Sequence, residues 1–270
     1  MKIKFIGVGS AFTTQDYYQS NLLITAPSGK RLLLDCGSDA RFALAESEIY
    51  GHNVGDMLDA IYISHLHADH IGGLEWLAFS TFFNPNAKKL KLFIEEQTMQ
   101  QLWDQSLRGG LERLEGQQLH LTDYFDCHPL AKDGTFSWEG INFTLSQMLH
   151  VDTGSPTNNH YSYGLSLTAD FCPNIFITTD TKFNPDFIIE IANKVDLIFH
   201  DCETTPYNTP VHAHYTELRT LPLFTKRKIW LYHYQSQSTY QPEEDGFRGF
   251  VLKGQEFDFS SKNAGELFII

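Results

Sequence analysis

The sequence contains little cysteine, with only four residues in 270, namely Cys36, Cys127, Cys172 and Cys202. None belongs to a CxxC pair and all are widely separated, so we expect four reduced thiols in a cytoplasmic protein. The sequence also lacks a signal-peptide pattern and any apolar run long enough to span a bilayer. We therefore expect no membrane association.

Positive charge is scarce as well. Lys and Arg number 20 against 33 Asp and Glu, which gives a net charge of -13. Long nucleic acids bind mainly through phosphate contacts to Lys and Arg, so they are disfavoured as partners. A small anion site remains compatible with this charge if metal ions supply the positive charge.

No linker, low-complexity tract or charge block divides the chain, and the 42% hydrophobic content suffices for one sizeable domain, 1–270. Apolar runs predict early strands, and the turn at 27–29 predicts a hairpin. Residues 97–115 are predicted to be helical, with an interruption at Gly109–Gly110. Strand–helix–strand patterns follow later, and the mixture favours an α/β layered domain with substantial antiparallel content.

Histidine, in contrast, is abundant, with 12 residues. The segment HLHADH (65–70) follows the apolar run AIYIS (60–64). In an extended stretch His65 and His67 point to the same side, while Asp69 and His70 fall at the turn. One short segment can thus supply ligands to two adjacent ions, and imidazole with carboxylate suits zinc, manganese or iron better than calcium.

Four ligands divided between two ions leave both ions unsaturated, so further ligands are expected at other strand ends. His150 follows FTLSQML, Asp180 follows NIFITT, and His233 lies in IWLYHYQ. A single histidine at a strand end is more often a hydrogen-bonded structural residue. Beside the HxHxDH cluster, however, these three residues become candidate ligands.

These residues, together with the strand end LLLDCG (32–37), resemble the metallo-β-lactamase superfamily. The resemblance implies an αβ/βα four-layer sandwich with a two-metal centre at one edge of its sheets. It also implies two divalent ions, zinc or alternatively manganese. The implied ligands are His65, His67 and His150 for the first ion, Asp69, His70 and His233 for the second, and Asp180 as the bridge between them.

Within this superfamily, the segments FHDCE (199–203), HAHYTEL (212–218) and WLYHYQ (230–235) resemble the ribonuclease Z-like phosphodiesterase branch. The resemblance implies that His214 is the catalytic histidine that does not bind metal, with His212 as the alternative. Asp201 takes the position of its acidic partner, and Glu203 offers a second acid. Asp69 would orient the attacking water in addition to binding metal.

Ribonuclease Z usually carries a long arm between the positions of His150 and Asp180, where this chain has only residues 151–179. The sequence therefore looks more like the anti-Pycsar proteins of phages and bacteria. That resemblance implies a homodimer that hydrolyses 3′,5′-cyclic mononucleotides and counters cyclic-nucleotide immune signalling. The alternatives are a ribonuclease Z-like tRNA 3′-processing endonuclease and a non-catalytic nucleotide-binding sponge. Candidate substrate contacts, chosen for rings that could stack on a base, are His160, Tyr161, Tyr163 and Tyr207.

Overall fold

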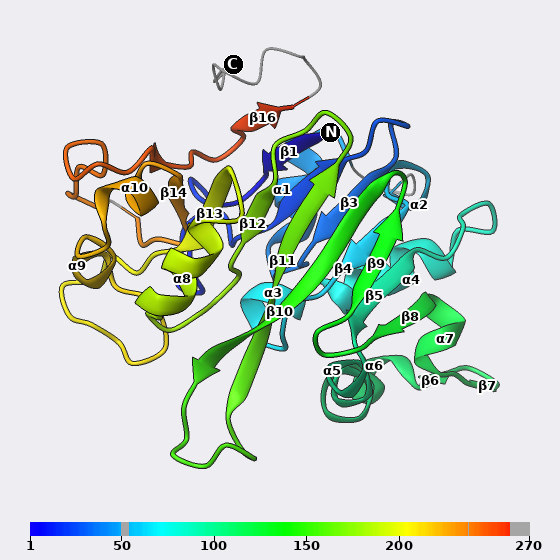
Figure 1. Ribbon diagram of the computed structural model, residues 1–270. Coiled ribbons are helices and arrows are strands. Elements are labelled where there is room, and N and C mark those ends of the chain that lie inside the picture. The colour runs from blue at the N-terminus through cyan, green and yellow to red at the C-terminus, as the bar shows by residue number, and fades with distance from the viewer. Residues whose placement is uncertain (50–53, 237, 260–270) are drawn as a thin grey trace.

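The computed structural model describes residues 1–49, 54–236 and 238–259. Within these residues two seven-stranded β-sheets lie face to face (Figure 1). The first has the order β16-β1-β2-β3-β4-β5-β8. Its strands are β1 (Lys2–Phe5), β2 (Leu22–Thr25), β3 (Arg31–Leu34), β4 (Ala60–Tyr62), β5 (Lys91–Glu95), β8 (Asp126–Leu130) and β16 (Glu256–Asp258).

The second sheet has the order β15-β14-β13-β12-β11-β10-β9. Its central strands β12, β13 and β14 are parallel, short and buried on both faces, as their continuous apolar runs require. The strands are β9 (Thr135–Trp138), β10 (Ile141–Val151), β11 (His160–Ala169), β12 (Ile175–Ile177), β13 (Leu197–Asp201), β14 (Ile229–Tyr232) and β15 (Gly249–Phe250).

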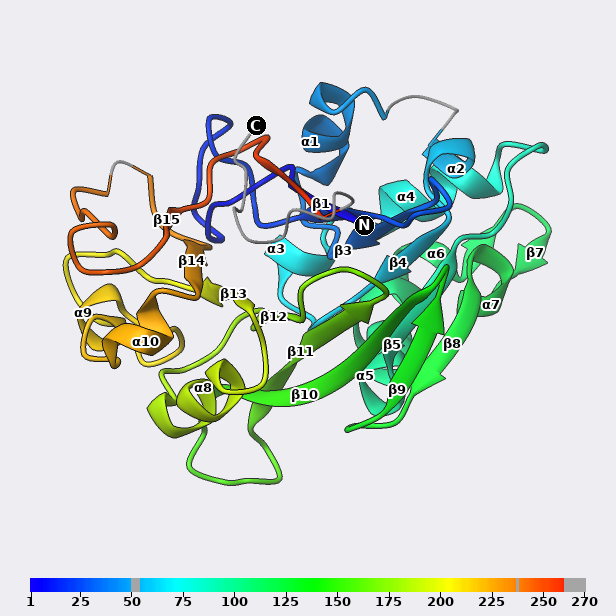
Figure 2. The same ribbon diagram turned by 45° about the horizontal axis from the view of Figure 1, so that its top comes forward.

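Helices cover the outer face of each sheet (Figures 1 and 2). An aromatic core fills the space between the sheets, where the ring of Phe5 lies 4.9 Å from that of Phe199 and 5.5 Å from that of Tyr232. The outer helices are α1 (Ala40–Glu46), α2 (Val54–Met57), α4 (Leu74–Phe82) and α7 (Leu121–Tyr124) on the first sheet, and α8 (Pro185–Ala192), α9 (Tyr215–Leu218) and α10 (Leu223–Lys226) on the second. The αβ/βα four-layer sandwich is therefore confirmed.

The hairpin predicted at residues 27–29 is present between β2 and β3, which pair antiparallel. Its turn places Gly29 at φ 85°, a conformation that glycine adopts without strain. The expected interruption at Gly109–Gly110 is wrong. Helix α5 (Glu96–Gln101) widens into the π-helix η2 (Leu102–Leu107), and α6 (Arg108–Leu111) then runs through both glycines. A Cβ at Gly110 would lie 2.3 Å from Glu75 Oε2, so the flexible Glu75 side chain would have to move aside.

The long hairpin of β10 and β11 extends past the neighbouring strands (Figure 1). Its register shifts between Leu149 and Val151, so His150 is the extra residue of a β-bulge. Bulges re-aim side chains and are common beside active sites. Donor atoms that follow β4 of the first sheet and β12 and β14 of the second come together with that of His150 at one end of the sandwich.

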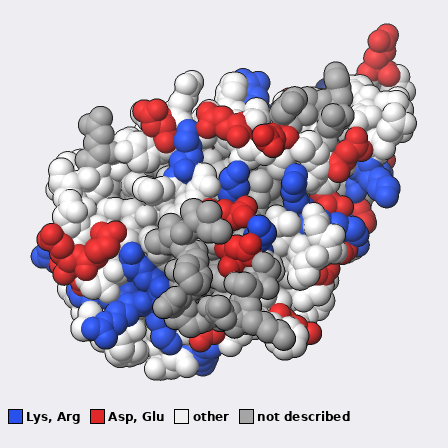
Figure 3. Space-filling view, turned by 90° about the horizontal axis from the view of Figure 1, so that it is seen from above, with Lys and Arg blue, Asp and Glu red and all other residues white. Residues whose placement is uncertain are grey.

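On the face shown in Figure 3, acidic side chains are interspersed with basic ones. This distribution agrees with the net charge of -13 in giving little support to a long polyanionic partner. No helix in the described part of the chain has the length and hydrophobicity needed to cross a membrane.

Candidate metal centre

The HLHADH segment begins three residues after the end of β4 and runs into the short helix α3 (Ala68–Ile71). His67 is the N-cap residue of α3, with extended backbone angles, and Asp69 and His70 occupy its single turn. His65, Asp69 and His70 are all buried, whereas His67 is half-buried. The change from strand to helix aims the two halves of the motif at two neighbouring points, as the sequence predicts.

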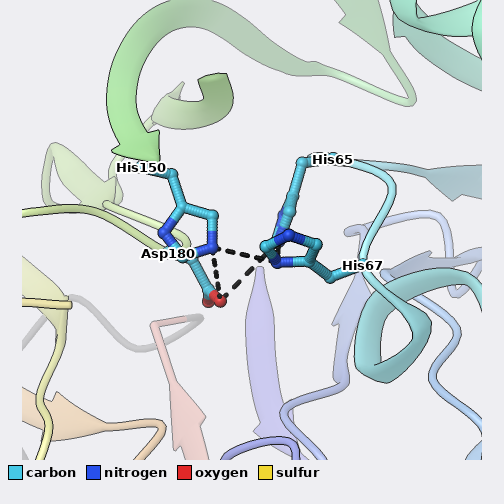
Figure 4. Close-up of side chains that lie close together, drawn as sticks. All are labelled: His65, His67, His150 and Asp180. Carbon is cyan, nitrogen blue, oxygen red and sulfur yellow. Dashed lines mark hydrogen bonds and ion pairs between the residues drawn. The ribbon is translucent and has the colours of Figure 1, made fainter. Parts of the chain in front are cut away.

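The first group of potential ligands consists of His65, His67, His150 and Asp180, whose donor atoms all lie within 4.8 Å of one another (Figure 4). His67 Nδ1 lies 3.2 Å from His65 Nε2 and 3.0 Å from His150 Nε2. Asp180 Oδ2 lies 3.7 Å from His65 Nε2 and 3.6 Å from His150 Nε2. Three imidazoles and one carboxylate form a donor set that suits zinc.

The second group consists of Asp69, His70, Asp180 and His233. His70 Nε2 lies 3.2 Å from Asp180 Oδ2, and His233 Nε2 lies 3.4 Å from Asp180 Oδ1 and 3.3 Å from Asp69 Oδ2. Asp180 belongs to both groups and directs one oxygen toward each of the two histidines. The structure thus brings together all seven predicted ligands, with Asp180 in the shared position.

Unpartnered buried atoms test whether this cluster fits metal ions. His70 Nε2 and Asp180 Oδ1 are buried and have no hydrogen-bond partner among the described residues. Leaving such atoms unsatisfied costs free energy, unless a ligand occupies the space between them. Burial lowers the pKa of His65 and His150, and that of His67 to about 4, so these imidazoles are neutral and their lone pairs are free to bind a cation. The cluster therefore fits two divalent ions.

Burial alone would also lower the pKa of His70 and His233, but the neighbouring carboxylates, Asp180 foremost, reverse the effect. The pKa of His70 is raised well above its usual value, and that of His233 is raised to about 10. Without an ion, protons on these imidazoles neutralise the carboxylates. Metal binding must displace those protons. The positive charge that balances the carboxylates is therefore supplied either by protonated His70 and His233 or by metal ions.

Asp35, directly after β3, is linked by hydrogen bonds to a ligand of each group. Its Oδ2 atom accepts hydrogen bonds from His70 Nδ1 at 2.7 Å and Ser64 Oγ at 2.8 Å, and its Oδ1 atom accepts from Ser64 N at 2.8 Å. Ser64 Oγ also lies 3.0 Å from His65 Nδ1. One carboxylate therefore orients a ligand of each group. The sequence marked Asp35 only as a strand-end residue, and a serine next to the first ligand gave no signal.

Replacing Asp35 with asparagine is expected to weaken metal binding at both groups by about 10- to 100-fold, because hydrogen-bond partners of ligand histidines tune ligand orientation and basicity. Ser64→Ala should weaken the first group more than the second, because its hydroxyl contacts His65. Calorimetric titration of the metal-free protein measures both affinities. Asp59→Asn is the control, since Asp59 accepts the Arg31 amide at the other end of β3. An equal loss in this control would contradict the assignment.

His212 and Asp201 form a pair next to the two groups and, with Asp180 and His233, make up a third set of potential ligands within 4.8 Å of one another. His212 Nδ1 lies 2.8 Å from Asp201 Oδ2, which also accepts the Thr181 amide at 2.9 Å. Burial lowers the pKa of His212, but Asp201 outweighs this effect and the pKa is raised above its usual value. Asp201 Oδ1 lies 3.4 Å from His233 Nδ1. Neither of these two buried atoms has a hydrogen-bond partner among the described residues, so the histidine that Asp201 orients by a hydrogen bond is His212.

The resemblance implies that His214 lies beside the reacting centre. In the structure His214 belongs to none of the ligand groups of the described residues, and both of its ring nitrogens have other partners. His214 is the N-cap residue of α9, and its Nδ1 accepts the Thr216 amide at 3.2 Å. Its Nε2 lies 2.9 Å from the carbonyl oxygen of Thr205 and donates to it. Glu203 is also directed elsewhere, because its carboxylate accepts the Thr209 amide at 2.7 Å. The geometry therefore favours His212, the alternative in the sequence, with Asp201 as its partner.

The four candidate substrate contacts occupy different environments. The ring of His160 is half-buried beside the first group, 4.7 Å from that of His67. Tyr161 is half-buried, and Tyr207 is exposed in the loop before α9. The expectation for Tyr163 is not met, because its ring is buried in the core between the sheets and its hydroxyl accepts a hydrogen bond from Gln147 at 3.3 Å.

The matching family model and the similar proteins named below share the same description. Residues 1–257 match the family model for anti-Pycsar protein Apyc1. A protein of that description from Bacillus phage vB_BveM-Goe7 is 32% identical over 267 residues, which cover 94% of this chain and 97% of the relative. Another, from Paenibacillus harenae, is 34% identical over 236 residues, which cover 87% of this chain and 90% of the relative.

Solved structures share the fold at lower sequence identity. The metallo-β-lactamase fold protein YhfI from Bacillus subtilis superposes with a TM-score of 0.72, covering 95% of this chain and 98% of that chain, at 18% identity. The predicted superfamily fold is thus confirmed by an independent structure.

Proposed function

Because the chain belongs to the anti-Pycsar Apyc1 family, we propose that it is a two-metal phosphodiesterase that hydrolyses 3′,5′-cyclic mononucleotides to nucleoside monophosphates. The observation that carries the proposal is the pair of four-residue donor groups that share Asp180, with the His212–Asp201 pair directly beside them. Two divalent ions held there would lower the pKa of a water and neutralise charge on the phosphoryl oxygens.

The residues of the chain supply orientation and proton transfer. Asp69 belongs to the second group and would accept a hydrogen bond from the attacking water. This hydrogen bond would direct a lone pair of the water oxygen toward phosphorus. His212 donates its Nδ1 proton to Asp201, which leaves Nε2 to face the substrate. We propose that Nε2 donates a proton to the ester oxygen that leaves phosphorus, while Asp201 stabilises the charged imidazole before transfer. The ring then opens to a monophosphate.

Zinc is the proposed metal because three imidazoles and one carboxylate in the first group are a common zinc donor set. Manganese is the alternative, since it also binds carboxylates. The homodimer and the cytoplasmic location stay predictions from the family resemblance and the cysteine content. Countering cyclic-nucleotide immune signalling is the proposed role, since removal of the signal is the direct consequence of the proposed reaction.

Two other functions are less well supported. A tRNA 3′-processing endonuclease would have to bind a large polyanion, which the net charge of -13 opposes. A nucleotide-binding sponge has no need of a buried histidine–carboxylate pair next to two metal-binding groups. The His212–Asp201 hydrogen bond at 2.8 Å therefore favours catalysis.

A panel of substrates tests the proposal. Metal-loaded protein should convert cyclic CMP, UMP, AMP or GMP to the monophosphate, as measured by chromatography of the products, and should leave precursor tRNA intact. The chelated protein should be inactive and should recover when metal is restored. Tight binding of cyclic nucleotides without turnover would favour the sponge, and cleavage of precursor tRNA alone would favour the endonuclease.

A further inference from the structure

His160 lies where the loop of the long hairpin ends, on the strand opposite His150. It is the first residue of β11 and pairs with Val151, immediately after the bulge that contains His150. A bulge changes which face the next side chains occupy, so it allows histidines from both strands to point into the same space. The hairpin thus delivers two imidazoles to the metal centre.

The ring of His160 packs beside three ligands of the first group. Its centroid lies 4.7 Å from that of His67, 5.7 Å from that of His65 and 6.2 Å from that of His150. His160 does not belong to any of the three sets of donor atoms that converge within 4.8 Å among the described residues. It is therefore a neighbour of the first ion's position and not one of its ligands.

Among the described residues, the side chain of His160 makes ring contacts with three ligand histidines and no side-chain hydrogen bond. Its neighbour His67, in contrast, lies at hydrogen-bond distance from both His65 and His150. A half-buried imidazole gains nothing from losing its hydration unless a partner replaces the water. The contacts of His160 with the ligands are ring contacts, which leave its N–H group free for a bound molecule.

His160 and His212 have different nearest ligands in the centre. The ring of His212 is 5.0 Å from that of His150, in the first group, and 4.9 Å from that of His233, in the second, so it lies beside both groups. His160 is next to His67 and the first group. A phosphodiester held between the two groups would present an oxygen toward each of these histidines.

We propose that His160 is a substrate-binding residue whose ring N–H donates a hydrogen bond to a non-bridging oxygen of the phosphodiester on the side of the first metal ion. This inference rests on the proposed function, because it assigns a contact within the same reaction. Negative charge on that oxygen grows as the transition state forms, so the hydrogen bond stabilises the transition state more than the substrate. His160 and His212 then divide the work, the first holding an oxygen that stays on phosphorus and the second protonating the one that leaves.

Two variants separate this role from simple packing beside His67. His160→Phe keeps an aromatic ring and removes the donor, while His160→Gln keeps a donor on a side chain of similar reach. Inorganic phosphate is the probe, titrated calorimetrically into the metal-loaded protein. We expect the dissociation constant for phosphate to rise about 10-fold or more in His160→Phe and less in His160→Gln, with metal content unchanged in both. On cyclic nucleotides, kcat should fall by about 100-fold in His160→Phe.

The matched control is the same pair of substitutions at His128, whose side chain lies on β8 and pairs with Asp126 at 3.1 Å. Both His128 variants should bind phosphate as the wild type does. Unchanged phosphate affinity in His160→Phe, or a loss of bound metal that accounts for the whole effect, would overturn the proposal. If the wild type failed to hydrolyse every cyclic nucleotide but the phosphate effect persisted, the proposed reaction would fall while the phosphate contact of His160 remained.

Discussion

Replacing His212 with glutamine is expected to lower kcat by about 100- to 10,000-fold while both metal ions stay bound, because a positioned proton donor contributes an effect of this size. His212 belongs to neither of the two groups that share Asp180 with the HLHADH segment, so its removal leaves their donor atoms intact. Steady-state kinetics on a cyclic mononucleotide measure the loss, and elemental analysis measures the metal. Asp201→Asn should lower kcat as well, because the amide cannot stabilise a charged imidazole.

His214 provides the matched control for that experiment, since it lies two residues away. His214→Asn keeps an N-cap side chain on α9 and should retain near-normal turnover. His214→Ala removes the cap and should lower the free energy of unfolding by about 1 kcal/mol, which chemical denaturation measures. The assignment is wrong if turnover collapses in His214→Asn and survives in His212→Gln.

The difference between these two histidines shows where sequence reasoning stops. Both lie in the segment HAHYTEL, and the resemblance alone pointed to His214, whereas the geometry leads us to propose His212. A residue that begins a helix is held by the first free amides of that helix, and His214 meets this requirement through Thr216. His212 lies before the cap and is free to reach Asp201 at the end of β13. Only the position of α9 relative to that strand separates the two roles.

The ligand cluster was predictable because its main signal is local. Four ligand-type residues lie within positions 65–70, and the change from strand to helix there directs them to two points. The distal ligands follow apolar strands, and ends of neighbouring strands meet at one edge of a sheet. The sandwich followed from the family resemblance together with the mixed pattern of strands and helices.

Contacts that depend on tertiary packing could not be predicted from the sequence. Tyr163 was a candidate substrate contact, but it is the fourth residue of β11, and the pairing of β11 with β10 carries its ring into the core. Asp35 looked like an ordinary strand end, yet it orients His70 and, through Ser64, His65. Nothing in residue spacing reveals which buried carboxylate faces which imidazole, because the partners are 29 and 35 positions apart in the chain.

Replacing Asp180 with asparagine is expected to abolish turnover, with a loss of about 1,000-fold or more, because the substitution removes the one side chain that both donor groups share. An amide is neutral and offers a single oxygen, so it cannot serve both ions. The variant should bind less than two ions per chain by elemental analysis. Asp201→Asn is the informative comparison, since it should lose turnover while retaining metal.

The same substitution should also remove the dependence of stability on metal. In the wild type, an ion present at about 100 times its dissociation constant stabilises the folded state by about 2.7 kcal/mol, which corresponds to a rise of roughly 5–10 °C in Tm for a chain of this size. Thermal melts with and without chelator should show that shift in the wild type and a much smaller one in Asp180→Asn. If the chelator shifted both proteins equally, the ions would be bound elsewhere and Asp180 would not be their bridge.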